Sequence, residues 1–388
     1  GVAKDLELAV NWYQKAAVLG NARAQNNLGR MYQTGDGITK NLKLAFSWYQ
    51  KSADQGYAYA QSNLGYMYEI GLGVAKDVEQ AFNLYQKAAD QGNAPAQTNL
   101  AYMYQHGRGV DKDLKLAFKW YQKAADQGDV RGQNNLADMY LSGEGVDKDL
   151  KLAASWYQKA VDQGYAYSQG NLGYMYQNGL GVAKNLELAI ELFQKGADQG
   201  NSYSMGSLGY MYQNGLGVDK DLKQAASWYQ KAADQNDAYS QASLGYLYEF
   251  GLGVTKDLKL AINWYQRAAD QGNKYAKNNL ASLRSKTNID MAEVNIEKNA
   301  SKIETESAIQ INSPPLENSS FEIEFWNSVK DSSDPEEYQI YLEEFPEGKF
   351  VKLAQLRVKK YGDMSKPEFD FGNYHALVIG NDKYKHLS

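Results

Sequence analysis

Tyrosine side chains recur along this chain at an interval of 36 residues, with arginine or aspartate in their place in some units, and their chemistry suits binding. Tyrosine carries a rigid ring with a polar tip, which protein-recognition surfaces use heavily. Asparagine recurs close to the same positions, and its amide can pair with a peptide backbone. The candidate binding residues are Arg23, Arg30, Tyr66, Tyr102, Arg131, Asp138, Tyr174, Tyr210 and Tyr246.

The spacing of these residues places them on one face of a series of predicted helices. Within each helix they stand three, four or seven residues apart, as neighbours on a helix surface do. The asparagines that share this face are Asn26, Asn27, Asn63, Asn99, Asn134, Asn135, Asn171, Asn278 and Asn279. We therefore predict a strip that binds a peptide or protein partner, and the units in which arginine or aspartate replaces tyrosine are candidates for partner-specific contacts. The alternative is that the tyrosines pack between helices and only cover the core.

Residue types needed for several other kinds of chemistry are missing. The chain has no cysteine, so it holds no disulfide, zinc–thiolate site or thiol nucleophile. His106 is isolated in a predicted loop and is interpreted as a solvated residue, which leaves no candidate metal site, catalytic site or cofactor. The net charge of −5 comes from interspersed acids and bases, which argues against nucleic acid. No apolar run of about 18 residues predicts a membrane span.

The helices that position these residues follow from the repeat itself. A Gly-Val/Ile-x-Lys-Asp/Asn word opens at Gly1, Gly37, Gly73, Gly109, Gly145, Gly181, Gly217 and Gly253. A fixed period of this length predicts a solenoid in which each unit buries a face against its neighbours. Because the chain starts with glycine inside a repeat, we expect the natural N-terminus to lie upstream. The absence of cysteine leaves the compartment open, with the cytoplasm as the default.

Residues 58–93 illustrate one repeat, which predicts two helices. Apolar residues recur every four positions over 58–70, and Gly71 and Gly73 end this helix, as Gly35 and Gly37 do one repeat earlier. Asp77 stands at an N-cap position, and a second helix runs from Val78 to about Asp90. A glycine closes this second helix in every unit except one, where Asn236 replaces it. Asparagine is the next most tolerant residue for a positive φ, so this column selects backbone conformation.

The motif Ala-x-x-x-Leu-Gly-x-x-Tyr-x-x-Gly-x-Gly-Val, followed by Asp-x-x-x-Ala-x-x-Trp-Tyr-x-Lys-Ala-Ala, resembles the Sel-one-like repeat, a relative of the tetratricopeptide repeat. The resemblance covers residues 1–284. It implies an all-α fold, a right-handed α-solenoid of helix-turn-helix repeats that serves as an adaptor or scaffold in protein complexes. In the last helix Arg284 replaces the tyrosine and no Gly-x-Gly follows, so we expect the array to be capped there.

The remaining residues predict three further segments. Residues 285–320 lack aromatic side chains and are rich in polar residues, which is typical of a flexible linker. Residues 321–362 predict a small helical hairpin, broken at a Phe-Pro-x-Gly word. Residues 363–388 contain Ala-Leu-Val-Ile-Gly-Asn, which predicts a buried strand that opens an α/β domain.

Ala-Leu-Val-Ile-Gly-Asn-x-x-Tyr resembles the opening strand of bacterial caspase-like cysteine peptidases, of the metacaspase and paracaspase type. The family's cysteine nucleophile and histidine base lie downstream of this strand, and neither His375 nor His386 matches the catalytic position. We therefore expect no cleavage by this chain alone and interpret it as the recruiting or regulatory arm of such an endopeptidase. Two alternatives stay open: a stand-alone adaptor, or the arm of a nucleotide-binding α/β domain. The chain lacks the Gly-x-Gly-x-x-Gly turn of a dinucleotide-binding site, which argues against the second alternative.

Overall fold

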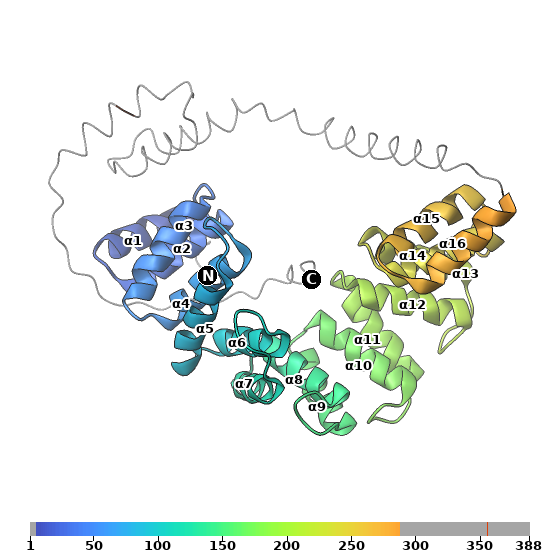
Figure 1. Ribbon diagram of the computed structural model, residues 1–388, viewed down its shortest axis with the longest axis horizontal. Helices are drawn as coiled ribbons and strands as arrows, with labels where there is room; N and C mark the ends of the chain where they lie inside the picture. Colours follow the sequence, from blue (N-terminus) through green and yellow to red (C-terminus); the bar gives the residue numbers. More distant parts are fainter. Residues whose placement is uncertain (1–4, 288–354, 356–388) are drawn as a thin grey trace. The chain divides into compact units, whose positions relative to one another are not determined.

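The computed structural model describes residues 5–287 and residue 355. Sixteen α-helices and no strand lie within these residues, which confirms a helical repeat solenoid (Figure 1). They fall into two units, of which the first contains α1 (Leu6–Val18), α2 (Ala22–Thr34) and α3 (Leu42–Asp54). The second unit contains α4 (Ala58–Ile70), α5 (Val78–Asp90), α6 (Ala94–His106), α7 (Leu114–Asp126), α8 (Val130–Ser142), α9 (Leu150–Asp162), α10 (Ala166–Asn178), α11 (Leu186–Asp198), α12 (Ser202–Asn214), α13 (Leu222–Asp234), α14 (Ala238–Phe250), α15 (Leu258–Asp270) and α16 (Lys274–Thr287).

Even-numbered helices begin each repeat and are called A helices here, and odd-numbered helices are called B helices. The B helices start at the predicted caps: the Asp77 side chain, for example, accepts a hydrogen bond from the backbone N–H of Gln80. The A helices end at glycines in the left-handed conformation, with φ of 86° at Gly35 and 74° at Gly71. The second glycine of each turn is left-handed too, with φ of 70° at Gly37 and 71° at Gly73. The cap residues therefore fix where the B helices begin, and the glycines fix where the A helices end.

Tyrosine rings from the B helices pack flat against the A helices and form much of the core. Tyr85, Tyr121, Tyr157, Tyr229 and Tyr265 are fully buried, together with leucine and methionine side chains of the A helices. A Cβ added at Gly65 would lie 3.0 Å from the ring of Tyr85. Glycine or alanine therefore recurs at this A-helix position because the ring of the following B helix needs the space.

The buried tyrosine hydroxyls are also satisfied. Tyr85 donates a hydrogen bond to Glu69 over 2.9 Å, and Tyr121 donates to Gln105 over 3.0 Å. Both acceptors stand at the same place in the last turn of an A helix. The repeats that carry this tyrosine thus hold a hydrogen bond between their two helices, where an unpaired buried hydroxyl would be costly, and α11 has Phe193 instead.

A ladder of glutamine side chains runs through the array. In α6 and α7, Gln127 donates to Gln97 over 2.7 Å, while Gln97 donates back to the carbonyl of Ala89 in the preceding B helix over 3.1 Å. The first of these bonds recurs with a spacing of 30 residues in most repeats. Met205 interrupts the ladder, where Gln235 meets its sulfur at 3.5 Å.

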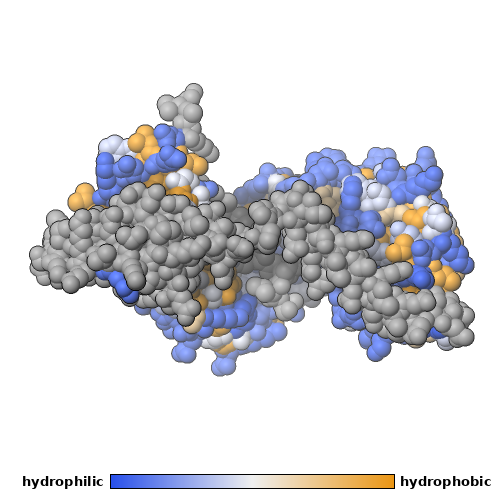
Figure 2. Space-filling view, turned by 90° about the horizontal axis from the view of Figure 1, so that it is seen from above, coloured by the Kyte–Doolittle hydropathy of each residue, from blue (hydrophilic) through white to orange (hydrophobic). Residues whose placement is uncertain are grey.

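The outside of the array mixes hydrophilic and hydrophobic residues, as the face in Figure 2 shows. Several lysines lie over tryptophan rings of the same B helix, with Lys159 Nζ at 3.5 Å from the ring centroid of Trp156. Such contacts shield part of an aromatic surface that would otherwise face water. Among the described helices, none has both the length and the apolar character that crossing a bilayer requires.

The segments predicted after the array lie almost entirely outside the described residues. Helix α16 extends to Thr287, three residues into the segment assigned to the linker. The predicted linker beyond that point, the helical hairpin at 321–362 and the strand within 363–388 have no described structure apart from residue 355.

Candidate binding surface

Six tyrosines line one face of four consecutive A helices in the second unit. We call this set the tyrosine strip: Tyr174, Tyr203, Tyr210, Tyr239, Tyr246 and Tyr275. Tyr239 is 51% exposed and Tyr275 52% exposed, and Tyr246 is half-buried. The tyrosine rings that form the core, such as Tyr229 and Tyr265, are fully buried, so the strip differs from the core in its access to solvent.

The helix period explains how the strip is assembled. Tyr203 and Tyr210 stand seven residues apart on α12, and Tyr239 and Tyr246 do so on α14, which keeps each pair on one face. Burial raises the pKa of Tyr203 to about 12, and the nearby Tyr174 hydroxyl on α10 adds to that shift. Burial also raises the pKa of Tyr239, with a smaller effect of Tyr210 in the same direction. Rings of adjacent A helices are therefore neighbours.

Small residues beneath the rings leave space for them. A Cβ added at Gly170 on α10 would lie 3.0 Å from the ring of Tyr203. Gly206 and Ala242 occupy the equivalent position in the next two A helices, whereas α2 and α8 have Asn26 and Asn134 there. Our sequence reading grouped those asparagines with the strip, but both are buried, with Asn26 at 0% exposure. Glycine or alanine at this position marks α10, α12 and α14, whereas α4 and α6 have Ser62 and Thr98 and α16 has Asn278.

Core tyrosines hold two of the strip rings in place. Tyr239 meets the ring of Tyr229 edge-on, with 6.3 Å between centroids, and Tyr275 meets Tyr265 in the same way at 6.5 Å. The Tyr229 hydroxyl donates to Gln213 over 2.8 Å. A surface whose rings are already fixed loses little conformational entropy when it binds a partner.

A pocket of about 410 Å³ opens between these rings. None of the side chains that line it is charged. They are Tyr210, Gln213, Asn214, Tyr239, Ala242, Ser243, Tyr246, Asn273 and Tyr275. The pocket thus offers aromatic faces for apolar contact, with amides and hydroxyls at hand for hydrogen bonds.

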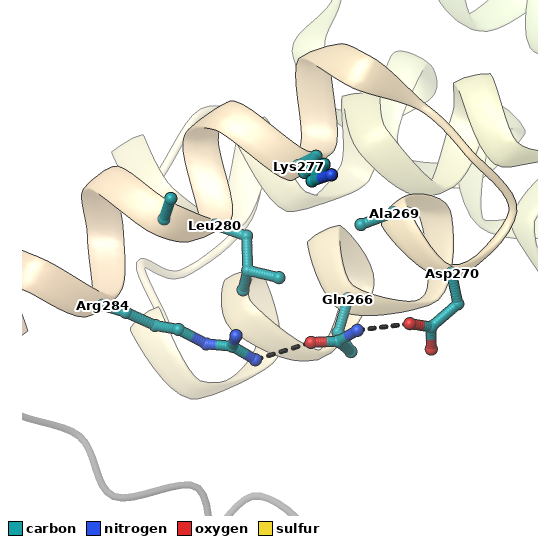
Figure 3. Close-up of a pocket in the computed structure, with 7 residues that line it drawn as sticks. Gln266, Ala269, Asp270, Lys277, Leu280 and Arg284 are labelled. Carbon is teal, nitrogen blue, oxygen red and sulfur yellow. Dashed lines mark hydrogen bonds between the residues drawn. The ribbon is translucent and has the colours of Figure 1, made fainter.

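A second pocket, of about 360 Å³, lies between α15 and α16 at the end of the described array (Figure 3). One repeat earlier, Trp264 packs in a core cluster with Ala233 and Leu244, which correspond to the pocket residues Ala269 and Leu280. Here Arg284 extends across the end and donates to Gln266 over 2.6 Å. Arginine in place of tyrosine gives this end a polar cover, consistent with a cap.

The predicted binding residues of the earlier A helices have partners within the protein. Arg30 pairs with Asp36 over 3.5 Å, and Arg23 is exposed on the same helix, α2. Tyr102 on α6 is exposed, but its ring contacts His106, with 4.2 Å between centroids, and Arg108. His106 is the last residue of that helix, not a loop residue as predicted.

Asp138 and Arg131 lie on α8, and Tyr66 lies half-buried on α4. Asp138 accepts the hydrogen bond of the buried Tyr157 hydroxyl and contacts Asn134 over 3.0 Å. In this repeat Leu141 occupies the place where other repeats have the glutamine or glutamate acceptor. The aspartate therefore replaces a missing acceptor, a role that sequence spacing did not reveal.

The chain is similar to proteins of known structure. A protective antigen of uropathogenic Escherichia coli with an SLR fold is 31% identical to it, with a TM-score of 0.58 over 91% of this chain and 79% of that one. A Sel1 repeat protein from Oxalobacter formigenes is 32% identical, with a TM-score of 0.55 over 71% of this chain and 79% of that one. No curated protein matches the chain.

The family model described as "Sel1 repeat" matches every unit of the array. The matched residues are 1–21, 22–57, 58–93, 94–129, 130–165, 166–201, 202–237 and 238–273. Since these units cover more than half of the sequence and agree with the observed helix pairs, the chain belongs to the Sel1 repeat family.

Proposed function

We propose that this Sel1 repeat protein is a protein–protein interaction scaffold and that the tyrosine strip is its main partner-binding surface. The observation that carries the proposal is the exposure of Tyr203, Tyr239 and Tyr275 at one position of three consecutive A helices. Packing does not require tyrosine there, because the same position holds Arg23 in α2 and Arg131 in α8. Large aromatic side chains at such a position suit an interface.

The charged residues of α2 and α8 contribute less to partner binding in this proposal. Arg30 has its own ion pair, and Asp138 serves the buried Tyr157 hydroxyl. A partner that displaced either contact would leave a polar group to be satisfied elsewhere, which opposes binding. The strip offers rings whose contacts with a partner would not break such pairs.

The test uses partner capture from an extract of the source organism with the immobilised chain. The strip variant carries Tyr203→Arg and Tyr239→Arg, substitutions to a residue that the chain already uses at this position. The matched control is Leu260→Ala on α15, whose side chain is 39% exposed outside the strip. A third variant, Tyr66→Ala with Tyr102→Ala, tests the earlier repeats.

We expect the strip variant to lose its captured partners, while the control keeps them and far-UV circular dichroism is unchanged for both. Capture that persists in the strip variant but is lost in the Tyr66/Tyr102 variant would move the binding surface to α4 and α6. Capture that persists in all variants would end the proposal for the A-helix face.

A finer proposal is that the scaffold serves as the arm of a caspase-like cysteine endopeptidase. It is supported only by the resemblance of residues 374–384 to the opening strand of that family. A cysteine nucleophile activated by a histidine would have to come from outside residues 1–388, since these contain no cysteine. The natural gene product should then react with a cysteine-directed probe, whereas this chain should not. An unlabelled gene product would leave the stand-alone scaffold.

A further inference from the structure

We infer that the pocket on α12, α14 and α16 binds a neutral, proline-rich segment in the polyproline II conformation. This inference rests on the proposed function and specifies the chemistry of the partner. The strongest observation is the composition of the pocket wall. Four tyrosine rings come from three A helices, amides and hydroxyls lie between them, and no lining side chain is charged. Aromatic-lined grooves of this kind recognise proline-rich segments.

Other modes of peptide recognition fit the pocket less well. Acidic or phosphorylated motifs are bound by arginine clusters, and none of the lining residues is an arginine. Addition of a strand to a sheet edge needs a sheet, and the described residues contain only helices. An amphipathic helix requires an apolar groove for its hydrophobic face. Here Gln213, Asn214, Ser243 and Asn273 stand among the rings instead.

The usual spacing of neighbouring helices suggests a register for a polyproline II segment. Such a segment rises about 3.1 Å per residue with three residues per turn, so each turn advances about 9 Å. Helices that pack side by side lie about 8–10 Å apart. Helices α12 and α14 contact each other, and so do α14 and α16. Each turn of the segment can therefore present one proline to the next A helix, which predicts prolines at every third residue.

Hydrogen bonding supports the same occupant. A polyproline II segment has no internal hydrogen bonds, so its carbonyls need donors from solvent or from a partner. The amide oxygen of Gln213 accepts a hydrogen bond from the Tyr229 hydroxyl, and its amide nitrogen can serve as a donor. The hydroxyls of the pocket tyrosines are further donors. Proline itself brings no N–H group that the pocket would have to satisfy.

The experiment measures the binding of defined peptides to the full chain by isothermal titration calorimetry. The first peptide has prolines at every third position, and the second has the same composition with prolines at every fourth position. Decaproline and a Gly/Ser peptide of equal length complete the set, and a neutral chito-oligosaccharide tests the other linear polymer that stacks on aromatic rings. The variants are Tyr239→Arg, Tyr239→Phe and the control Leu260→Ala.

We expect the every-third-residue peptide and decaproline to bind, and the Gly/Ser peptide not to bind. Tyr239→Arg should weaken binding about tenfold or more. Tyr239→Phe should weaken it less, because the ring stays and only the hydroxyl donor is lost, and Leu260→Ala should bind within about twofold of the original chain. Equal binding of the two proline spacings would overturn the register argument. Saccharide binding without peptide binding would overturn the inference as a whole.

The two levels of the proposal fail separately. If no proline peptide binds but Tyr203→Arg with Tyr239→Arg still abolishes partner capture, the inference about proline is wrong and the scaffold function stands. If partner capture survives the strip variant and proline peptides also fail, both are wrong.

Discussion

At the scale of single residues, the position that closes each B helix shows how backbone conformation selects the amino acid. Gly128 has φ of 87° and Asn236 has φ of 69°, both left-handed. The Asn236 side-chain oxygen accepts hydrogen bonds from Gln241 at 3.1 Å and from Gln271 at 3.2 Å. One glutamine of the ladder makes a related contact at Gly128, where Gln163 donates to the backbone carbonyl. Asparagine thus offsets its backbone strain with side-chain hydrogen bonds.

Substitutions at these two positions separate strain from hydrogen bonding. Gly128→Ala should lower the free energy of unfolding by about 1–2 kcal/mol, the cost of a left-handed residue with a Cβ. No steric clash adds to this cost, because the added Cβ meets no atom within 4 Å. Asn236→Gly should stay close to the original stability, since relief of strain and loss of two hydrogen bonds oppose each other. Asn236→Ala should be the most destabilised of the position-236 variants. Urea midpoints measured by circular dichroism decide these signs, and an unchanged Gly128→Ala midpoint would contradict the assignment.

At the scale of elements, the α8–α9 pair holds its buried tyrosine in a way that differs from its neighbours. The Tyr157 hydroxyl bonds to Asp138 in the middle of α8, whereas Tyr121 bonds to Gln105 in the last turn of α6. Leu141 occupies the place of that glutamine. With Asp138 and Leu141 in place of the usual residues, α8 thus still supplies an acceptor for the buried Tyr157 hydroxyl.

This exchange predicts a coupled pair of mutations. Asp138→Tyr alone removes the acceptor of a buried hydroxyl and should cost about 1–3 kcal/mol. Adding Leu141→Gln restores the arrangement of the other repeats and should recover most of that loss. A double-mutant cycle of these two positions measures their coupling energy, and additive effects would show that the glutamine introduced at position 141 does not replace Asp138 as the acceptor of the Tyr157 hydroxyl. Partner capture by the double variant also tests whether Asp138 has a direct binding role.

The sequence predicts those parts of the fold and of the candidate site that depend on short-range features. The helices at 58–70 and 78–90 have their predicted bounds, because caps, glycines and apolar spacing are short-range features. Spacing also placed Tyr174, Tyr210 and Tyr246 on one A-helix face. It did not reveal the glutamine ladder, since Gln97 and Gln127 are 30 residues apart and show no amphipathic pattern. Nor did it show that Asn26 is buried, because a helix face does not by itself say which neighbour covers it.

At the scale of the whole molecule, the buried tyrosine column makes the array sensitive to alkali. Burial is the main cause that raises the pKa of Tyr49, Tyr121, Tyr157, Tyr229 and Tyr265 far above 10. The folded chain therefore keeps these protons at pH values where the unfolded chain has lost them. By linkage, this contribution to stability is fully present below pH 10, the unfolded value, and is lost as the pH rises through the folded pKa.

We therefore expect the array to lose stability steeply above about pH 10. Tyr121→Phe is the matched variant, because Phe193 already occupies the equivalent position in α11. It should cost about 0.5–1.5 kcal/mol at pH 8, where only the bond to Gln105 is lost. Above pH 10 its stability should fall less steeply than that of the original chain, by about 1.4 kcal/mol per pH unit. Urea unfolding at pH 8 and pH 11 measures both effects, and parallel curves would mean that Tyr121 ionises normally.

The break in the glutamine ladder has a consequence for how the array opens and closes. In a repeat protein, a folding front advances by forming one interface after another. Met205 has no N–H to give to the carbonyl of Ala197, whereas Gln241 makes the corresponding bond to Ala233. The step from α11 to α12 therefore lacks this bond, as does the step from α9 to α10, but only Met205 also deprives the next glutamine, Gln235, of an amide acceptor. Amide hydrogen exchange should therefore divide the second unit at α12. Helices α12 to α16, which carry the tyrosine pocket, can therefore unfold locally as one unit while the preceding repeats stay folded.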